Sequence, residues 1–326
     1  MQGDPFLPCI SRKQEMNYRF TGHETFPCRY AWLPKAFLAI TNDAKVFADD
    51  ERAMVELGVG KNMVHAIRFW VQVTGVVVSS KEGFSVTSFG QQLLSAQGFD
   101  PFLEDVRTLW LIHWKLSTHI DEPLFAWDYL LNHWHHPEIS RTEALRAFRQ
   151  EANRLDRTLA DITLEQHFDT FLHTYVPTRS SKSIIQEDTL DCPLVELNLI
   201  QRIGERKLDS SGKSETVYAF RREPKPEITS GLFIYCLADF WATRRPHEET
   251  LSFRDVALTP GSPGQVFKIP EWEIRERLET LEEDSQGVYQ YRESAAFERI
   301  SRLALLSDIS LETVYSSHAR SESLYA

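Results

Sequence analysis

The stretch from residue 45 to 96 constrains the fold more than any other part of the sequence, because helix and strand patterns alternate there in a fixed order. "DDERAMVEL" is typical of a helix, "GVG" of a turn, and "KNMVHAIRFWVQVT" of a second helix. The β-branched runs "GVVVSS" and "FSVTS" flank the turn "KEG" and predict a β-hairpin, and "SFGQQLLSA" predicts a third helix. We therefore expect a winged helix-turn-helix here, since that motif has helix, turn, helix and hairpin in this order.

Two later segments repeat this pattern less clearly. One, at about 183–222, contains the short helix "CPLVELNLI" before a hairpin; the other, at about 250–297, contains a Pro/Gly turn, a long helix "IPEWEIRERLETLEE" and a strand. Between the first two segments, apolar and aromatic residues recur at helical spacing over 99–177. The expected fold class is therefore mainly α with small β-hairpins (α+β), with winged helix-turn-helix units around a helical block.

These patterns also predict how the chain is divided. The expected parts are a disordered extension (1–17), an N-terminal segment with the winged helix (18–98), a helical block (99–180), a helix-plus-hairpin unit (181–226), a C-terminal winged-helix-like domain (227–310) and a tail (311–326). With 326 residues, of which 42% are hydrophobic, the chain can form two or three domains with real cores.

Composition also predicts the compartment. No apolar run approaches the roughly 18 residues of a membrane span, and the opening residues lack the apolar block of a signal peptide. The four cysteines are scattered singly without a Cys-x-x-Cys pair, which is typical of reduced thiols and argues against a structural zinc site. We therefore expect a cytoplasmic protein without a membrane partner.

The charge is unevenly distributed. A formal net charge of −11 argues against a surface that binds nucleic acid everywhere, although a local basic patch would be sufficient. From residue 57 to 81 there are three basic residues and no acidic one, whereas residues 271–284 hold seven acids. The second helix of the 45–96 stretch is therefore the best candidate for a local DNA-binding patch.

On a helix over 61–74, at about 100° per residue, one narrow face is polar and faces away from Met63, Ile67 and Trp70. Lysine and arginine suit phosphates and guanine edges, and asparagine and glutamine suit adenine. The residues predicted to bind DNA are Lys61, Asn62, His65, Arg68 and Gln72 of this helix, Lys81 at the tip of the wing, and Arg29. The alternatives are an ordinary solvated face or a surface for a partner protein.

The stretch "TGHETFPCRYAWLPK" at 21–35 is rich in polar and aromatic residues but has little periodicity. His23 and Glu24 are candidates for acid–base or metal chemistry; alternatively, His23 and Arg29 anchor the loop to the core. Asp188, in the acidic "QEDTLDCP", is the third catalytic candidate, because clustered carboxylates can hold Mg²⁺ for phosphodiester hydrolysis. Carboxylates in this stretch can equally cap the helix that follows.

Five stretches, in order and covering about residues 18–300, resemble the SspB-like family of bacterial DNA phosphorothioation systems, which is classed as a domain of unknown function. They are "FTGHETFPCRYAWLPKA", "LGVGKNMVHAIRFW", "FDTFLHTYVP", "EDTLDCPLVELNLI" and "LSFRDVALTPGSPGQVFKIPEWEIRERLETLEE". The resemblance implies a role in replacing a non-bridging phosphate oxygen of DNA by sulfur, in antiviral defence. It implies an ATPase and an ATP-pyrophosphatase-type subunit as partners, and DNA nicking as the activity.

The sequence contains no P-loop, nucleophile elbow or His-Glu-x-x-His helix, which argues against an ATPase or an ordinary hydrolase. The expected function is a DNA-binding component of a phosphorothioation system that nicks one strand, with Mg²⁺ as the cofactor of the nickase. Two alternatives stay open: a non-catalytic recognition or scaffold subunit that recruits the sulfur-transfer enzymes, and a winged-helix transcriptional regulator.

Overall fold

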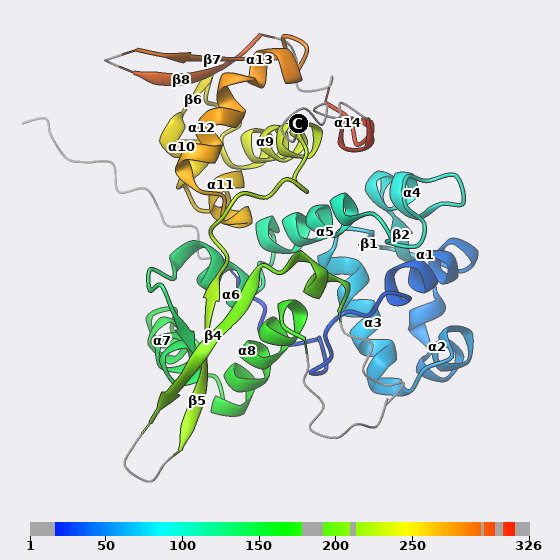
Figure 1. Ribbon diagram of the computed structural model, residues 1–326. Coiled ribbons are helices and arrows are strands. Elements are labelled where there is room, and N and C mark those ends of the chain that lie inside the picture. The colour runs from blue at the N-terminus through cyan, green and yellow to red at the C-terminus, as the bar shows by residue number, and fades with distance from the viewer. Residues whose placement is uncertain (1–16, 178–191, 209–212, 295–296, 304–308, 317–326) are drawn as a thin grey trace, which may run out of the picture.

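The computed structural model describes residues 17–177, 192–208, 213–294, 297–303 and 309–316. This part of the chain is mainly helical and contains three small antiparallel sheets, which confirms the expected class of α structure with small hairpins. In Figure 1 the N-terminal helices (blue to cyan), a central part with a long projecting hairpin (green) and a C-terminal part (yellow to red) pack around one another. None of the helices described is long and apolar enough to cross a membrane.

The N-terminal part confirms the order expected from the sequence. Its elements are α1 (Trp32–Asn42), η1 (Val46–Ala48), α2 (Asp50–Leu57), α3 (Lys61–Val73), β1 (Val77–Ser80), β2 (Gly83–Val86) and α4 (Ser88–Leu94). The Asp49 side chain caps α2, and Gly58 ends this helix with a left-handed φ of 66°. The Phe84 N–H of β2 donates to the Ala44 carbonyl at 2.9 Å, so the segment before α2 lies beside the hairpin.

The central part joins the expected helical block to the second hairpin. It contains α5 (Val106–Thr118), α6 (Phe125–Asp128), η2 (Tyr129–His133), β3 (Ile139–Ser140), α7 (Arg141–Arg154), α8 (Asp161–Tyr175), η3 (Pro193–Leu197), β4 (Ile200–Lys207) and β5 (Ser214–Phe220). Strand β3 pairs with β5, which gives the sheet order β3-β5-β4. The second hairpin therefore belongs to a sheet that starts inside the block expected to be wholly helical.

The C-terminal part is built on the same plan. It contains α9 (Ser230–Arg244), β6 (Thr250–Ser252), α10 (Phe253–Ala257), α11 (Pro263–Phe267), α12 (Glu271–Glu279), α13 (Leu281–Asp284), β7 (Tyr289–Glu293), β8 (Glu298–Arg302) and α14 (Glu312–Tyr315). The long helix expected over 269–283 is divided at Thr280 into α12 and α13. The sheet order is β6-β8-β7.

One topology thus recurs in the chain. In the central and C-terminal parts, a first strand leads into helices, a hairpin follows, and the second strand of that hairpin pairs with the first strand. In the N-terminal part, Ala44 occupies the position of the first strand, next to β2. The similarity expected from the sequence rhythm is therefore present as shared strand order.

Helix α5 lies at the centre of the packing. All seven residues from Thr108 to Trp114 are buried. Trp114 Nε1 donates to an Asp239 carboxylate oxygen of α9 at 2.7 Å, and Thr108 Oγ1 lies 2.7 Å from the Tyr315 hydroxyl of α14. The central and C-terminal parts therefore share one continuous core around this helix.

The contact of α14 with α9 leads to a test of this packing. A Cβ added at Gly231 would lie 2.0 Å from the Thr313 carbonyl oxygen, so Gly231→Ala must push α14 away. We expect a loss of about 1–3 kcal/mol in the free energy of unfolding and earlier proteolysis near residue 312. Gly204→Ala is the control, because its Cβ would meet no atom within 4 Å. Equal stability of the two variants would contradict the docking of α14.

Candidate nucleic-acid interface

Helix α3 has a narrow polar face, as its periodicity predicts. Val64, Ala66, Ile67, Phe69, Trp70, Val71 and Val73 are buried. The residues of α3 that keep exposed surface are Lys61, Asn62, Met63, His65, Arg68 and Gln72. Met63, expected on the buried side, is thus partly exposed, whereas the polar residues lie where the sequence places them. Their binding of DNA remains a prediction.

Two side chains of this face, Lys61 and His65, already have a carboxylate partner within the protein. The Asp50 carboxylate, at the first turn of α2, lies 3.0 Å from Lys61 Nζ and 3.1 Å from His65 Nε2. Hydrogen bonds from Lys61 and His65 lower the pKa of Asp50. The start of α3 is therefore less positive than its sequence indicates, since one carboxylate from a neighbouring helix faces both groups.

Arg68, one turn further along, is in a different environment. Within the described residues, Arg68 forms no ion pair and no side-chain hydrogen bond. The Arg19 guanidinium lies close to it: the pKa of Arg19 is lowered by burial and also by the positive charge of Arg68. The Arg19 guanidinium lies over the Phe69 ring, 4.6 Å from its centre. The opposing charge of Glu122 acts to raise the pKa of Arg19.

Arg19 was not predicted from the sequence. It precedes "FTGHETF" with no periodic pattern, and it comes close to α3 because its backbone pairs with residues 123–125: its N–H donates to the Pro123 carbonyl at 3.0 Å. A Cβ on Gly22 would lie 2.8 Å from the Phe69 ring and 3.1 Å from an Arg19 nitrogen. Only glycine at position 22, with φ 108°, leaves room for the guanidinium.

The remaining predicted DNA contacts are separate from one another. Gln72 Nε2 donates to Ser79 Oγ of β1 at 3.0 Å, which ties the end of α3 to the hairpin. Lys81 is exposed at the β1–β2 turn, beside Glu82. Arg29 lies in the loop before α1, where its guanidinium stacks on Trp32 at 5.5 Å. Only Arg68 thus combines an unpaired charge with a second arginine.

His23 is a buried member of a histidine pair. Its side chain is only 3% exposed, and its Nε2 lies 3.1 Å from Nδ1 of His167 in α8. The Ala126 N–H donates to His167 Nε2 at 3.0 Å, and the Thr25 N–H donates to His23 Nδ1 at 3.1 Å, so each ring is also held by a backbone N–H on its other nitrogen. Burial lowers the pKa of His23 to about 4. This geometry matches the alternative in which His23 anchors the loop to the core; its catalytic role stays a prediction.

Glu24 is exposed beside that anchor. Glu24 and Thr25 both have left-handed backbone conformations, with φ 49° and 64°, which is unusual for residues other than glycine. Backbone strain of this kind is frequent at functional sites. The turn therefore points the Glu24 carboxylate away from the core, although His23 next to it faces inwards.

The third catalytic candidate, Asp188, lies outside the residues that the structure describes. Within the described ranges, no group of three or more His, Cys, Asp and Glu side chains is arranged to hold a metal ion. His23 and Glu24 do not form such a group, so the described residues around them do not fit a magnesium site. A magnesium-dependent role for Asp188 remains a prediction from its sequence context.

The fold and these positions can now be compared with known proteins. The family model of DUF4007, proteins of unknown function, matches residues 20–315. The chain belongs to the DUF4007 family. Two solved structures share its fold, "Magnesium ion-bound SspB crystal structure" (TM-score 0.77) and "SspB crystal structure" (TM-score 0.75); each is 24% identical in sequence, over 90% of this chain and 86% of that chain. No curated protein matches the chain in sequence.

Family membership confirms the resemblance drawn from the sequence motifs, and the shared fold extends over nearly the whole chain. The DUF4007 match begins at Phe20 and so includes the loop with His23 and Glu24, helix α3 and the second and third hairpins. At 24% identity, the likeness to SspB concerns the fold. The chemistry of this DUF4007 protein must therefore be argued from its own residues.

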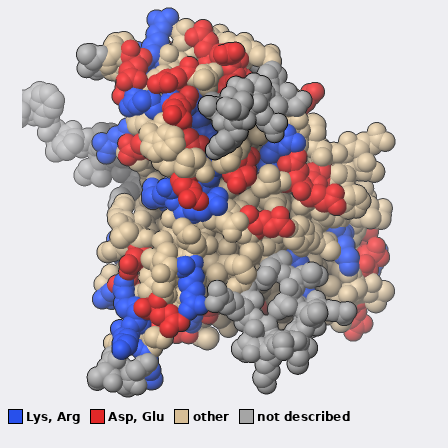
Figure 2. All heavy atoms as spheres, in the orientation of Figure 1, with Lys and Arg blue, Asp and Glu red and all other residues tan. Residues whose placement is uncertain are grey.

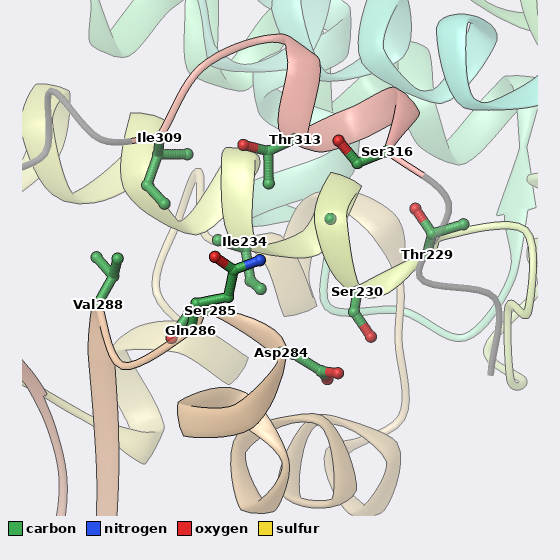
Figure 3. Close-up of a pocket in the computed structure, with 11 residues that line it drawn as sticks. Thr229, Ser230, Ile234, Asp284, Ser285, Gln286, Val288, Ile309, Thr313 and Ser316 are labelled. Atoms are coloured by element: carbon green, nitrogen blue, oxygen red, sulfur yellow. The ribbon is translucent and has the colours of Figure 1, made fainter.

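A cavity of about 230 Å³ lies away from α3, between the start of α9, the end of α13 and residues 309–316. Figure 3 shows Ser230, Asp284, Ser285 and Thr313 around it. Asp284 is the one charged side chain among the described residues that line it. A negative, hydroxyl-rich lining does not suit phosphate, so this cavity is not part of the candidate interface.

The buried histidines predict how stability depends on pH. Burial lowers the pKa of His113 to about 3 and of His23 to about 4, and it holds the pKa of His167 well below 6.5. The unfolded chain therefore binds more protons between pH 6.5 and about 4, and stability falls as the pH falls through that window.

Each histidine contributes about 1.4 kcal/mol per pH unit below 6.5, so denaturant titrations should show a loss of about 3–4 kcal/mol between pH 7.5 and 5.5. His133 opposes this loss in part, because the Asp128 hydrogen bond raises its pKa. In His23→Gln the pH-dependent loss should shrink by about a third, since one of the three groups is removed. The same loss in wild type and variant would show that His23 titrates normally.

Proposed function

We propose that this protein is the DNA-binding component of a DNA phosphorothioation system. The observation that carries the proposal is the polar face of α3, where Arg68 and the neighbouring Arg19 form no ion pair within the described residues, in a chain of net charge −11. Membership of the DUF4007 family and the fold shared with SspB support a role in a phosphorothioation system. The unpaired positive charge on α3 supports DNA as the ligand.

The N-terminal part further supports assignment as a winged helix-turn-helix. Helices α2 and α3 are joined by the turn Gly58–Gly60, and the β1–β2 hairpin follows directly. In such motifs the start of the second helix enters the major groove, and the hairpin contacts the backbone. Lys61 and Asn62 would then face base edges, and Lys81 a phosphate.

Asp50 acts as an intramolecular competitor for the DNA in this proposal. Its carboxylate holds Lys61 and His65, which must exchange it for phosphate when DNA binds. Arg68 needs no such exchange, because no carboxylate holds it in the described residues. Arg19, braced on Phe69, adds a second guanidinium for the same phosphate backbone.

The exchange predicts a gain of affinity on removing Asp50. In Asp50→Asn, the freed Lys61 and His65 should strengthen binding of a duplex about three- to tenfold and steepen its salt dependence by about one unit. Glu51→Gln is the matched control, because it removes the same charge one residue away without facing either group. Fluorescence anisotropy at several salt concentrations measures both quantities. If the two variants change the affinity equally, the gain comes from the lost negative charge in general and not from the release of Lys61 and His65.

The complementary change removes the cations. Lys61→Ala with Arg68→Ala should weaken duplex binding and lower its salt dependence, because each lost phosphate contact contributes about 0.9 to the slope. Arg68→Ala should have the larger single effect, since Lys61 is neutralised by Asp50 before binding. An unchanged slope in the double variant would refute the role of α3 and leave a partner-protein surface or a solvated face.

The resemblance to SspB-like proteins further implies partners and an activity. We propose an ATPase and an ATP-pyrophosphatase-type subunit as partners, which this chain recruits to DNA. Whether the chain also nicks one strand distinguishes an enzyme from a recognition or scaffold subunit. Of the three catalytic candidates, Glu24 is exposed, His23 is buried, and Asp188 lies outside the described residues.

Nicking of supercoiled plasmid, with and without Mg²⁺, tests the enzymatic role. If Glu24 and Asp188 are catalytic, Glu24→Gln and Asp188→Asn should abolish nicking. For Glu24→Gln the thermal midpoint should change little, because Glu24 is exposed. His23→Ala should lower the thermal midpoint, because it leaves the buried His167 Nδ1 without its hydrogen-bond partner. Normal nicking by all three variants would show that the catalytic residues lie elsewhere.

A further inference from the structure

The hairpin β4–β5 is the longest of the three hairpins and projects from the body of the molecule (Figure 1). Its strands have eight and seven residues, against five each in β7–β8 and four each in β1–β2. Most side chains of β4 are exposed, since only Ile200 is buried. The far half of this hairpin meets the rest of the protein through Arg206, which pairs with Glu138 and Glu143, and through Glu215. The exposed side chains beside these contacts are available to a partner.

Basic side chains gather along this hairpin, with acidic ones between them, as Figure 2 shows at the lower left. Lys207 and Lys213 flank its turn, are both exposed, and form no ion pair within the described residues. The two carboxylates in the described part of the hairpin are engaged: Glu205 pairs with Arg202, and Glu215 accepts from the Thr142 N–H at 3.0 Å. Asp209 of the turn lies outside the described residues. Within the described residues the lysines are thus left without a carboxylate partner.

The strand register places these lysines on opposite faces of the ribbon. Lys207 pairs with Ser214, so the two side chains share one face. Lys213 precedes Ser214, and its carbonyl accepts from the Leu208 N–H at 2.8 Å, so its side chain lies on the other face. Leu208, 47% exposed, lies between the two charges near the turn.

The equivalent hairpins differ at the same place. Near the turn of β7–β8, Glu293 and Glu298 are both held by Arg275, at 2.7 and 2.9 Å. At the turn of β1–β2, Lys81 is next to the exposed Glu82. Among the described residues, β4–β5 is therefore the hairpin whose end carries unpaired positive charge on both faces.

We propose that the β4–β5 hairpin is a second DNA contact, in which Lys207 and Lys213 bind phosphates on the two sides of one groove of a duplex. A major groove about 12 Å wide admits a two-stranded β-ribbon, and phosphates line both of its walls. This inference rests on the proposed DNA-binding function and adds a contact far along the chain from α3. The positive charges of Lys207 and Lys213 suit a polyanion. Because the two lysines lie on opposite faces of the ribbon, they can reach both walls of a groove, whereas a flat surface would meet only one of them.

The test is duplex binding by Lys207→Ala with Lys213→Ala, measured by anisotropy from low to high salt. We expect about tenfold weaker binding and a salt slope lower by nearly two, because each phosphate contact contributes about 0.9. The control is Arg254→Ala with Arg292→Ala, which removes two exposed charges, one on α10 and one on the hairpin β7–β8, that form no ion pair within the described residues. Equal thermal midpoints should accompany both doubles, since all four side chains are exposed.

The outcomes separate this inference from the function on which it rests. If the wild type binds duplex DNA but the lysine double keeps its salt slope, the hairpin contact is refuted and the α3 proposal stands; the hairpin then serves an acidic protein surface or no ligand. If the lysine and arginine doubles weaken binding equally, the effect is one of net charge, and the specific contact is again refuted. If the wild type does not bind, the proposed function fails and the hairpin contact fails with it.

Discussion

The structure depends on the burial of α5, most of whose buried polar side chains have partners. Seven consecutive residues of this helix are buried, and an unpaired buried donor costs about 1–3 kcal/mol. Among them only the Trp110 ring N–H lacks a partner. His113 lies between the Tyr175 hydroxyl, at 2.7 Å, and the Val266 carbonyl, at 3.1 Å. Trp114 and Lys115 share the Asp239 carboxylate. These directional contacts fix α8, α9 and α11 around one helix.

The same pairing principle separates structural from functional charge. Many arginines face carboxylates within the protein, as Arg275 faces Glu293 and Glu298. An exposed cation without such a partner keeps its charge available to an external anion. Arg68 with Arg19, and Lys207 with Lys213, are two such places, on different parts of the chain. Asp50 shows the intermediate case, in which a site is partly neutralised until its ligand arrives.

Much of the fold could be predicted from the sequence where the pattern was local. The order of α2, α3, β1, β2 and α4 follows from a change of hydrophobic period and from glycines at turns, and it is confirmed. In the third segment a strand was expected after the long helix, and β7 is present there; its partner β8 lies beyond the segment. The pairing of β3 with β5 was not, because a two-residue strand has no period to detect, and its partner is over seventy residues away. The break at Thr280 also carried no signal, since no proline or glycine marks it.

The sequence by itself determined the fold class, the family and the polar face of α3, because each of these depends on residue types at fixed short spacings. Only the tertiary structure decided which of those polar residues are free. Asp50 is eleven residues before Lys61 and reaches it because α2 folds back onto α3; Arg19 reaches Arg68 because its backbone pairs with residue 124. His23 is buried because α8 supplies His167, 144 residues later. Charge and burial depend on neighbours in space, and spacing along the chain does not encode those neighbours.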